Sequence, residues 1–551
     1  MLLGTLFTLL AQCLLIEATS CLVKHDGGFV PDHVLRVSSR NISIACTSRQ
    51  SAVVNGTSPG PELRVPAGQR TWIRVYNDLE QENLTMHWHG LAQRMAIFAD
   101  GSPQGSQWPI PPGHFFDYEL QTTVEDAGTY FYHSHVGMQA LTASGALIVE
   151  GCERPPYQYD DERTLHWSDF FPQTDHEIEV GLQSVPLVWP GEVRAVLLNG
   201  KGIGIGHEAD VSPSGDCSLP VIDVDPGKTY RFRFIGATGL SLVSMGFEGH
   251  QNLTIIQVDG GEWTKPASVD RIQLASGQRF DALFKAKTEE ELASEGRQTY
   301  FIQFETRDRP EVYRGYAVIR YSKASTTPHV PTIPPLTLPN NTYDWLEYEL
   351  RPLIETVTQP TLGEVTRRVI INASQLTDPQ NQHVVWRLAN LSWTEAVRQT
   401  PLLVDIYKFG DLAIPNYDAA LANYGWDPET RAFPAKVGEV LEIVFQNTGS
   451  LVGSDGAVDI HPFHAHGEHF YDIGSGDGVY DAEANEAKLV AMNYTAVKRD
   501  TTMLYHYAAT TTPGAPAGWR AWRLRVTQPG VWMIHCHILQ HMVMGKSADA
   551  V

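Results

Sequence analysis

Near the C-terminus the chain contains His535-Cys536-His537, three consecutive residues whose side chains are well suited to binding a transition metal. They follow the hydrophobic segment 531–534, whose β-branched and aromatic residues predict a buried strand. Side chains alternate between the two faces of a strand, so both histidines point to one side and Cys536 to the other, where His541 can join it. A thiolate with two imidazoles is the ligand set of a type 1 copper, and two parallel imidazoles suit another metal centre. The tripeptide therefore predicts two metal sites on opposite faces of one strand, with electrons passing between them through the backbone.

Three further motifs repeat the His-x-His spacing. They are His-Trp-His-Gly at residues 87–90, His-Ser-His at 133–135 and His-Pro-Phe-His-Ala-His-Gly at 461–467. With His541, the four motifs contain ten of the 21 histidines, which the packing of an ordinary core does not explain. By contrast, His207 and His250 stand alone, and we expect ordinary surface or core positions for them. For His469 we expect a supporting or core position.

On these four motifs the chain resembles the multicopper oxidases, from about Val53 to Gly545. The resemblance implies four copper ions per chain, dioxygen as oxidant and a small organic reductant, phenolic or ascorbate-like, as electron donor. It implies a type 1 copper held by His461, Cys536 and His541, and a trinuclear cluster between the first and third domains. In that cluster it assigns His87 and His464 to the type 2 copper, His89, His133 and His537 to one type 3 copper, and His135, His466 and His535 to the other.

Asp100 and Cys536 are the catalytic candidates. Organic donors give up one electron at a time, whereas dioxygen needs four to become water, so Cys536 would connect the site that accepts single electrons with the site that collects them. Asp100 matches an acidic residue that the family keeps near the trinuclear cluster, and we expect it to deliver protons there. The alternative interpretation of Asp100 is an ordinary Asp-Gly turn.

The length and composition describe a large, acidic, folded protein. At 551 residues the chain exceeds one hydrophobic core, and about three domains is the natural division. The net charge of −22 argues against nucleic acid or an anionic membrane as a partner. After the N-terminal segment, no run of residues is long and apolar enough for a transmembrane helix. The oligomeric state stays open.

Short alternating strands and frequent turn residues predict an all-β protein of three Greek-key β-sandwich domains, which the resemblance implies are cupredoxin-like. We expect these domains at residues 21–151, 152–321 and 343–551, with a Pro-rich linker at 322–342. Residues 436–447 echo residues 67–77, which indicates duplicated domains. The second domain lacks a histidine cluster, and in the family it is a metal-free spacer that helps to shape the substrate site. A short acidic helix is predicted at 288–294.

Residues 1–20 are hydrophobic and end in small residues, which predicts a secretory signal and an extracellular location. Sequons for N-glycosylation agree with a secreted glycoprotein; they lie at Asn41, Asn55, Asn83, Asn252, Asn340, Asn372, Asn390 and Asn493. Apart from one cysteine in the signal and Cys536, four cysteines can pair in three ways. The resemblance to plant ascorbate oxidases implies a disulfide between Cys46 and Cys217, and it leaves Cys21 and Cys152 as the second candidate pair.

The C-terminus departs from the family's pattern. The family's axial neighbour of the type 1 copper, commonly Met, Leu or Phe, lies ten residues after the cysteine, where this chain has Lys546. Because an ammonium beside a cationic copper is electrostatically unfavourable, we expect Lys546 to turn away. We also expect no closing strand before Val551, as in a truncated C-terminus.

The electron donor stays open between two members of the family. Residues 198–202 with Cys217 and residues 224–231 point to the ascorbate-oxidase-like branch, and residues 461–476 resemble its fungal members. Ser-Asp-Phe-Phe at 168–171, however, stands where the plant enzymes have a tryptophan pair for stacking the donor. Laccase-type oxidation of a phenol and oxidation of an ascorbate-like enediol are therefore both candidates. Aromatic residues that could line the donor site, or belong to the core, are Phe170, Phe171, Trp189 and Trp519.

Other functions need different features. A ferroxidase-like metal oxidase needs carboxylates beside the type 1 histidines, for which Asp459 and Glu468 are the acidic residues near the motifs. A copper electron carrier needs only the type 1 ligands, and the eight further histidines argue against it. A copper protein inactivated by its altered C-terminus is a further alternative, and the number of copper ions per chain separates these possibilities.

Overall fold

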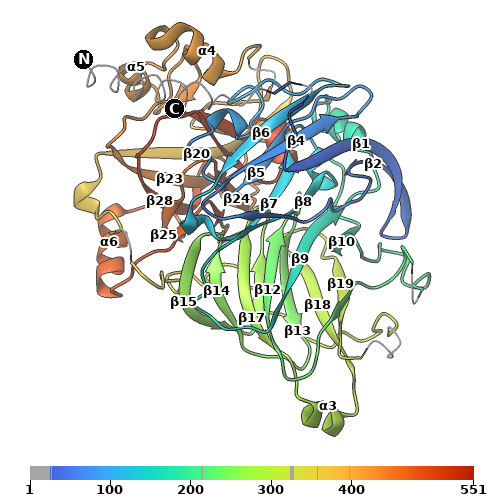
Figure 1. Ribbon diagram of the computed structural model, residues 1–551. Helices are drawn as coiled ribbons and strands as arrows, with labels where there is room; N and C mark the ends of the chain where they lie inside the picture. Colours follow the sequence, from blue (N-terminus) through green and yellow to red (C-terminus); the bar gives the residue numbers. More distant parts are fainter. Residues whose placement is uncertain (1–24, 27, 213–214, 323–327, 356–357, 396–397) are drawn as a thin grey trace, which may run out of the picture.

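The computed structural model describes residues 25–26, 28–212, 215–322, 328–355, 358–395 and 398–551. The expected signal segment 1–20 lies outside these residues. Within them the predicted all-β fold is confirmed, because six sheets pack in pairs into three sandwiches. Figure 1 shows the first domain (blue) and the third (orange to red) side by side, with the second domain (green) below them.

The first domain packs a sheet of strand order β2-β1-β4-β6 against one of order β3-β8-β7-β5. Its strands are β1 (His33–Ile44), β2 (Thr47–Val54), β3 (Leu63–Pro66), β4 (Arg70–Asn77), β5 (Met86–His89), β6 (Phe115–Gln121), β7 (Gly128–Ser134) and β8 (Ser144–Glu150). Its 3-10 turns are η1 (Ile97–Ala99), η2 (Val124–Asp126) and η3 (Gln139–Leu141). Buried and exposed residues alternate along β3, as expected for a sheet with one face in the core. β5 and β7 are buried throughout.

The second domain packs a sheet of order β10-β9-β12-β17-β14-β15 against one of order β11-β19-β18-β13-β16. Its strands are β9 (Asp161–Phe170), β10 (Ala195–Leu198), β11 (Val221–Asp223), β12 (Thr229–Gly236), β13 (Leu242–Phe247), β14 (Leu253–Val258), β15 (Glu262–Val269), β16 (Arg271–Leu274), β17 (Arg279–Lys285), β18 (Thr299–Arg307) and β19 (Arg314–Arg320). Its helices are α2 (Asp175–Leu182) and α3 (Glu289–Glu295). Helix α3 is the acidic helix predicted from the sequence, and the Thr288 side chain caps it by accepting from the backbone N–H of Glu291.

The third domain packs a sheet of order β21-β20-β23-β28-β25-β26 against one of order β22-β30-β29-β24-β27. Its strands are β20 (Arg367–Thr377), β21 (Val384–Leu388), β22 (Ala432–Phe433), β23 (Val440–Thr448), β24 (His461–Ala465), β25 (Phe470–Gly476), β26 (Lys498–Arg499), β27 (Thr501–Leu504), β28 (Pro516–Arg525), β29 (Trp532–Cys536) and β30 (Ser547–Ala550). Helical segments are η4 (Leu362–Glu364), α4 (Leu402–Phe409), η6 (Gly410–Leu412), α5 (Tyr417–Leu421), α6 (Ala482–Ala491) and α7 (Leu539–Val543). The expectation of no closing strand was wrong, because β30 pairs antiparallel with β29 and parallel with β22.

The three domains repeat one arrangement of strands. β1, β9 and β20 each pair in parallel with a strand, β4, β12 or β23, that pairs on its other side antiparallel with β6, β17 or β28. β4 and β23 include most of the two segments whose similarity suggested a duplication. In the second sheets, β7, β18 and β29 occupy equivalent places, each next to β5, β13 or β24. The histidine motifs of the first and third domains therefore lie on equivalent strands.

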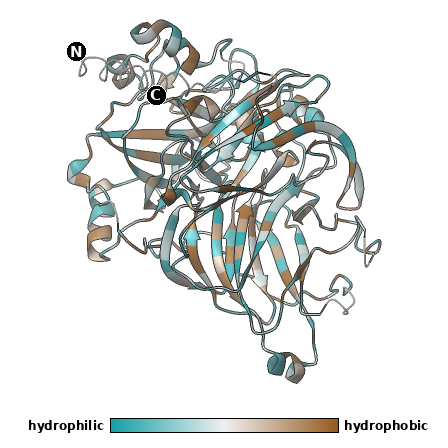
Figure 2. Cartoon of the chain, viewed as in Figure 1, coloured by the Kyte–Doolittle hydropathy of each residue, from teal (hydrophilic) through white to brown (hydrophobic). Residues whose placement is uncertain are grey.

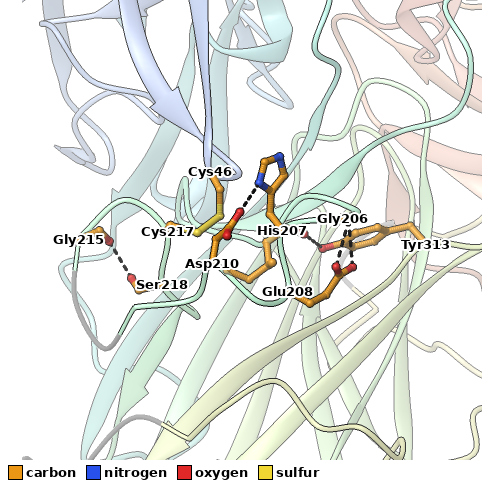
Figure 3. The surroundings of a disulfide bond; sticks show 10 residues. Cys46, Gly206, His207, Glu208, Asp210, Gly215, Cys217, Ser218 and Tyr313 are labelled. Atoms are coloured by element: carbon orange, nitrogen blue, oxygen red, sulfur yellow. Dashed lines mark hydrogen bonds and ion pairs between the residues drawn. A yellow bond between two sulfur atoms is a disulfide. The ribbon is translucent and has the colours of Figure 1, made fainter.

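A disulfide links the first two domains. Cys46, in the turn after β1, is bonded to Cys217, in the loop before β11, with an S–S distance of 2.05 Å (Figure 3). This is the pairing that the resemblance implied. Cys152 is exposed and has no bond to another described cysteine. Its expected partner, Cys21, lies outside the described residues, so that pairing stays a prediction.

The core follows the alternation of the strands. Figure 2 shows hydrophilic and hydrophobic residues alternating along many strands, most clearly in the second domain. The two isolated histidines are structural, as expected: His207 pairs with Asp210 on the surface, and His250 bonds the Tyr321 hydroxyl in the interior. No helix in the described part of the chain has the length and apolar character needed to span a bilayer.

Candidate metal centres

The histidine motifs lie on neighbouring strands where the first and third domains meet. Antiparallel pairing sets His87 of β5 opposite His133 of β7, and His464 of β24 opposite His535 of β29. All ten histidines are buried: His87, His89, His133, His135, His461, His464, His466, His535, His537 and His541. The tertiary fold therefore gathers histidines from distant parts of the chain into one region.

The end of β29 presents two different donor sets. Cys536 Sγ lies 3.8 Å from His461 Nδ1 and 3.6 Å from His541 Nδ1, so one face has a thiol between two imidazoles. On the other face, His535 Nε2 lies 3.4 Å from His135 Nε2. The alternation expected from the sequence is thus present, and Cys536 is the shared boundary of the two donor sets.

The second donor set contains eight imidazoles from both domains. His87 Nε2 lies 3.4 Å from His464 Nε2, and His466 Nε2 lies 3.2 Å from His535 Nε2. The expected triad of His135, His466 and His535 is one compact group, whose nitrogen atoms lie within 4.8 Å of one another. His133 groups with His87 and His89, while His537 Nε2 lies 3.1 Å from His89 Nδ1. The eight imidazoles are together, and their division among individual copper ions stays a prediction.

Hydrogen bonds determine which nitrogen of each ring is available to a metal. The Nδ1–H groups of five rings donate to oxygen: His87 to Asp100 O (2.6 Å), His133 to Ser134 O (2.8 Å), His464 to Asp500 O (2.9 Å), His466 to Asp100 Oδ2 (2.8 Å) and His535 to Cys536 O (3.0 Å). A backbone carbonyl only accepts, and so does the carboxylate oxygen that faces His466, so Nε2 keeps its lone pair in these rings. His89 is reversed. Its Nε2 faces Asp500 Oδ1 at 3.2 Å, which leaves Nδ1 toward the cluster.

The residues fit copper ions at both donor sets. Burial lowers the pKa of His133 to about 4 and of His135 to about 3, so these rings are neutral at neutral pH. Neutral rings that face each other with lone pairs repel unless a cation lies between them, and His133 Nε2 has no hydrogen-bond partner among the described residues. Burial also raises the pKa of the Cys536 thiol to about 11, and a bound metal would replace its proton. A thiolate with two imidazoles is the donor set of type 1 copper.

Asp100 borders the eight-histidine cluster. It follows η1 and is fully buried. Its Oδ2 accepts from Ser102 Oγ at 2.7 Å and from His466 Nδ1 at 2.8 Å, while its backbone carbonyl accepts from His87 Nδ1. Oδ1 has no hydrogen-bond partner among the described residues. Burial raises the pKa of Asp100 to about 6, so this carboxyl can exchange a proton near neutral pH.

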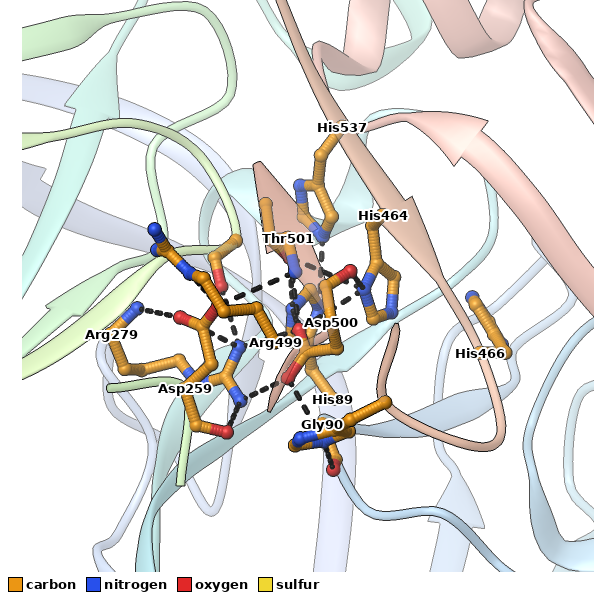
Figure 4. Close-up of polar contacts among 12 residues, drawn as sticks. His89, Gly90, Asp259, Arg279, His464, His466, Arg499, Asp500, Thr501 and His537 are labelled. Carbon is orange, nitrogen blue, oxygen red and sulfur yellow. Dashed lines mark hydrogen bonds and ion pairs between the residues drawn. The ribbon is translucent and has the colours of Figure 1, made fainter. Parts of the chain in front are cut away.

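Asp500 is a second acidic residue at the cluster, and the sequence analysis did not identify it (Figure 4). Its Oδ1 lies 3.2 Å from both His89 Nε2 and His464 Nδ1. Burial alone would raise its pKa, but Arg279 of the second domain holds that pKa well below the usual range. His469 Nε2 lies 3.3 Å from Asp500 Oδ2, a supporting position. No local motif marks Asp500, because Arg279 is 221 residues away in the chain.

Lys546 is fully buried beside the predicted type 1 site, so the expectation that it turns away was wrong. Its Nζ lies 3.6 Å from the centre of the Trp386 ring, and that ring lies 4.6 Å from the ring of His541. The backbone decides this position, since Lys546 accepts from the Cys536 N–H and donates to the His541 carbonyl. Burial lowers the pKa of Lys546 to about 7, while the aromatic face stabilises its charged form.

The outer edge of the predicted type 1 site carries charged side chains. Asp459 Oδ2 lies 3.6 Å from His541 Nε2, and its side chain is 34% exposed. Arg309 of the second domain pairs with Asp459 at 3.3 Å and with Glu192 at 2.7 Å. Its guanidinium lies 5.8 Å from the Trp189 ring centre, which places this tryptophan near the same edge.

The other aromatic candidates belong to the core. Phe170 and Phe171 are buried in the second domain, and Trp519 packs inside the third domain against Tyr480. The strand that carries Phe170 is fixed by its neighbour Asp169, whose Oδ2 accepts three consecutive backbone N–H groups at residues 239–241. Residues 169–171 therefore have a structural role, and they offer no exposed aromatic surface on which a donor could stack.

The comparisons with known proteins agree with this site. Family models described as multicopper oxidase match residues 36–154, 161–324 and 399–551. Laccase-like multicopper oxidase 1 of Thermothelomyces thermophilus is 55% identical over 99% of this chain and 90% of its own. Multicopper oxidase aurL2 of Gibberella zeae is 48% identical over 95% and 88%. L-ascorbate oxidase of Cucurbita pepo var. melopepo is 31% identical over 89% of each chain.

Solved structures share the fold at lower identity. Fet3p, a multicopper oxidase that functions in iron import, has a TM-score of 0.73 at 22% identity, over 94% of this chain and 90% of its own. Laccase from Botrytis aclada has a TM-score of 0.71 at 23% identity, over 94% and 87%. The three sandwiches are thus cupredoxin-like. The family models cover most of the chain, the relatives named above are more than 30% identical over nearly its whole length, and the donor sets fit copper. The chain therefore belongs to the multicopper oxidases, copper-dependent oxidoreductases that use dioxygen, and it is of the laccase-like kind.

Proposed function

We propose that this chain couples one-electron oxidation of a small phenolic donor to four-electron reduction of dioxygen to water. The type 1 copper would be bound by His461, Cys536 and His541. The trinuclear cluster would be bound by His87 and His464 (type 2), by His89, His133 and His537 (type 3), and by His135, His466 and His535 (type 3). This makes four copper ions per chain.

The observation that carries the proposal is the geometry at the end of β29. Cys536 faces two imidazoles on one side, and the adjacent histidines face the eight-imidazole cluster on the other. An electron that reaches Cys536 is therefore one residue of backbone from His535 and from His537. An electron carrier would need only the first donor set, whereas this chain has both.

Copper supplies reversible one-electron transfer and binds dioxygen when both centres are loaded. The protein holds the imidazoles through oxygen acceptors, so each ring has a fixed orientation before the metal binds. Asp100 Oδ1 is the atom at which we place the proton for dioxygen reduction, since it is buried and unpartnered among the described residues. Asp100 Oδ2 meanwhile keeps His466 in place.

The donor would meet the protein at the edge of His541. The stretch that matches the tryptophan pair of the plant enzymes contains Asp169 and Phe170, both buried, which supports a phenol over an enediol. Burial would raise the pKa of Asp459, but the nearby His541 ring and the charge of Arg309 hold it at about 2, so this carboxylate stays charged. A negative charge beside the electron entry disfavours ascorbate, which is itself an anion at neutral pH.

A ferroxidase-like activity has less support. Fe(II) would need carboxylates free to bind it beside the type 1 histidines. Asp459 is paired with Arg309, and Glu468 is paired with Arg94 at 2.7 Å. Each of the two carboxylates considered from the sequence is thus paired with an arginine, so neither is free to bind Fe(II).

We also propose that the protein is secreted. The disulfide between Cys46 and Cys217 is the kind of bond that persists in oxidising compartments. The eight sequon asparagines are all exposed, so glycans could be attached without unfolding. Detection of the glycosylated protein in culture medium, with its mature N-terminus after residue 20, tests this proposal.

The decisive experiment measures oxygen uptake by the purified, copper-loaded protein with a simple diphenol and with ascorbate, and counts copper on the same sample. We expect about four copper ions per chain and uptake that favours the diphenol. Uptake with ascorbate alone would replace the phenolic donor by an enediol. About one copper ion would favour an electron carrier, and empty sites would point to inactivation by the altered C-terminus around Lys546.

A further inference from the structure

One turn of the second domain reaches the predicted trinuclear site, although that domain contributes no ligand candidate. The turn connects β16 to β17 and spans residues 275–278. Ser276 and Gly277 lie within it, and Arg279 is the first residue of β17. All three are buried. Their contacts are with the first and third domains as well as with their own.

Ser276 determines the state of His537. Its Oγ lies 2.8 Å from His537 Nδ1, and two backbone carbonyls, those of Thr238 and of His537 itself, lie where they can accept its hydroxyl hydrogen. A hydroxyl has one hydrogen, so with that hydrogen on a carbonyl the oxygen accepts from Nδ1–H. His537 Nε2 therefore keeps its lone pair and points at the cluster.

Gly277 allows the turn to approach this closely. Its φ is +85°, and an added Cβ would lie 3.0 Å from His89 Cε1 and 3.2 Å from His537 Cδ2. Any side chain here would be strained and would push against two predicted copper ligands.

Arg279 determines the state of His89 through Asp500 (Figure 4). Its two guanidinium nitrogens donate to the two carboxylate oxygens at 2.7 and 2.5 Å. Asp500 Oδ1 then lies 3.2 Å from His89 Nε2, which leaves Nδ1 toward the cluster. The Arg279 backbone N–H donates to Asp259, whose other oxygen accepts from Arg499 at 2.8 Å. Asp500, Arg279, Asp259 and Arg499 thus form a row of charges of alternating sign. The Arg279 guanidinium is held in place by the carboxylates on both sides of it.

We propose that Ser276, Gly277 and Arg279 of the second domain form a positioning element of the trinuclear copper site, which fixes the nitrogen that His537 and His89 present to copper. The inference rests on the copper assignment proposed above. It gives the metal-free domain a direct part in the metal site.

The alternative is that these contacts only hold the domains together. A positioning role and a role in domain packing predict different effects of a small substitution on copper binding. Supporting contacts of metal ligands typically affect metal affinity by about 10- to 100-fold. Contacts that only join domains change stability and leave the affinity and spectrum of the bound metal as they are.

The test uses Ser276→Ala and Arg279→Lys in the full-length, copper-loaded protein. Copper is titrated and counted, the visible absorption of the type 1 centre is recorded, and the paramagnetic resonance spectrum reports type 2 copper separately. We expect trinuclear copper to bind about 10- to 100-fold more weakly, with an altered type 2 spectrum. The type 1 absorption per chain should be unchanged.

Matched controls come from the same domain. Arg231→Lys changes another buried arginine that pairs with a carboxylate, Asp281, and Ser244→Ala removes another buried hydroxyl. Neither residue has a contact with a ligand candidate among the described residues, so both variants should retain the wild-type copper content and spectra.

Wild-type copper affinity and type 2 spectrum in both test variants would overturn the inference. If Arg279→Lys does not fold, Ser276→Ala decides alone, because it removes a single oxygen atom. A wild-type protein that binds no trinuclear copper would overturn the proposed function and this inference together. By contrast, a wild-type protein with its full copper content and variants with unchanged copper binding would overturn this inference alone.

Discussion

The second domain has the same pair of sheets as its neighbours, but equivalent strands hold different chemistry. In the third domain, β24 and β29 set Phe463 opposite Cys536 and place a histidine pair next to them. In the second domain, β13 and β18 set Met245 opposite Phe304, and both are fully buried. The same architecture thus makes a metal site in one domain and an apolar core in the other. The fold provides places for side chains, and their identity decides what those places do.

The comparison also shows what a domain without ligands can contribute. The eight imidazoles come from the first and third domains, but Ser276 and Arg279 of the second domain contact the groups that orient two of them. Arg309 of the same domain lies at the edge of the predicted type 1 site. The second domain supports both centres from outside the donor sets.

The largest effect is expected where β29 carries the thiol. Cys536→Ser replaces a soft thiolate by a weak oxygen donor, so the visible absorption of the type 1 centre should disappear. Oxygen uptake should fall by more than about 100-fold, beyond the range for supporting contacts. Absorption spectra and oxygen consumption measure this. Cys152→Ser, at an exposed cysteine, is the control and should change neither; a blue, active Cys536→Ser protein would contradict the ligand assignment.

The equivalent strand of the second domain should respond in stability alone. Phe304 of β18 is fully buried, 4.9 Å from the Trp167 ring. Phe304→Ala leaves a cavity, and we expect the second domain to lose about 3–5 kcal/mol of its unfolding free energy. Urea unfolding measures this loss, and copper per folded chain should stay at the wild-type value. Loss of copper from folded Phe304→Ala protein would break the distinction between the two strands.

Burial of the ligand histidines should make the metal-free protein sensitive to acid. Burial lowers the pKa of His541 from 6.5 to about 4, so between these values the unfolded chain binds a proton that the folded chain does not. The unfolding free energy should therefore decrease as pH falls from about 6.5 to about 4, by about 3 kcal/mol for this residue. Urea unfolding of metal-free protein at several pH values tests this. The unfolding free energy of His541→Gln should depend less steeply on pH. Equal slopes in the variant and the wild type would contradict the lowered pKa of His541.

The smallest effect is expected for Asp100→Asn, which should slow the reaction at the trinuclear cluster and leave the reaction at the type 1 centre unchanged. Asp100→Asn keeps the shape of the side chain but removes the proton, so reoxidation of the reduced protein by dioxygen should slow by about 100-fold. Reduction of the type 1 centre by the donor should keep its rate, as measured by stopped-flow absorption. Asp477→Asn, in a surface Asp-Gly turn, is the control. Equal slowing of both half-reactions would reject the proton role of Asp100.

Much of the site could be predicted because its signals are local. The two faces of His535-Cys536-His537 follow from the alternation of side chains along any strand, and the spacing to His541 is short. The acidic helix α3 was likewise predictable, since its cap and its first turn are adjacent in sequence. The supporting residues were not. Asp500, Ser276 and Arg279 belong to no motif of their own.

By itself, the amino-acid sequence determined the donor atoms, their alternation along the strands and the all-β architecture, because each depends on residues a few positions apart. Only the tertiary structure decided which oxygen holds each imidazole, that the second domain reaches the trinuclear site, and that Lys546 is buried against Trp386. These contacts join residues far apart in the chain. Their geometry depends on how three sandwiches pack together, which no local pattern encodes. The expectation for Lys546 was wrong for the same reason: pairing of β30 with β29 fixes its backbone, and electrostatic preference alone could not move the side chain to solvent.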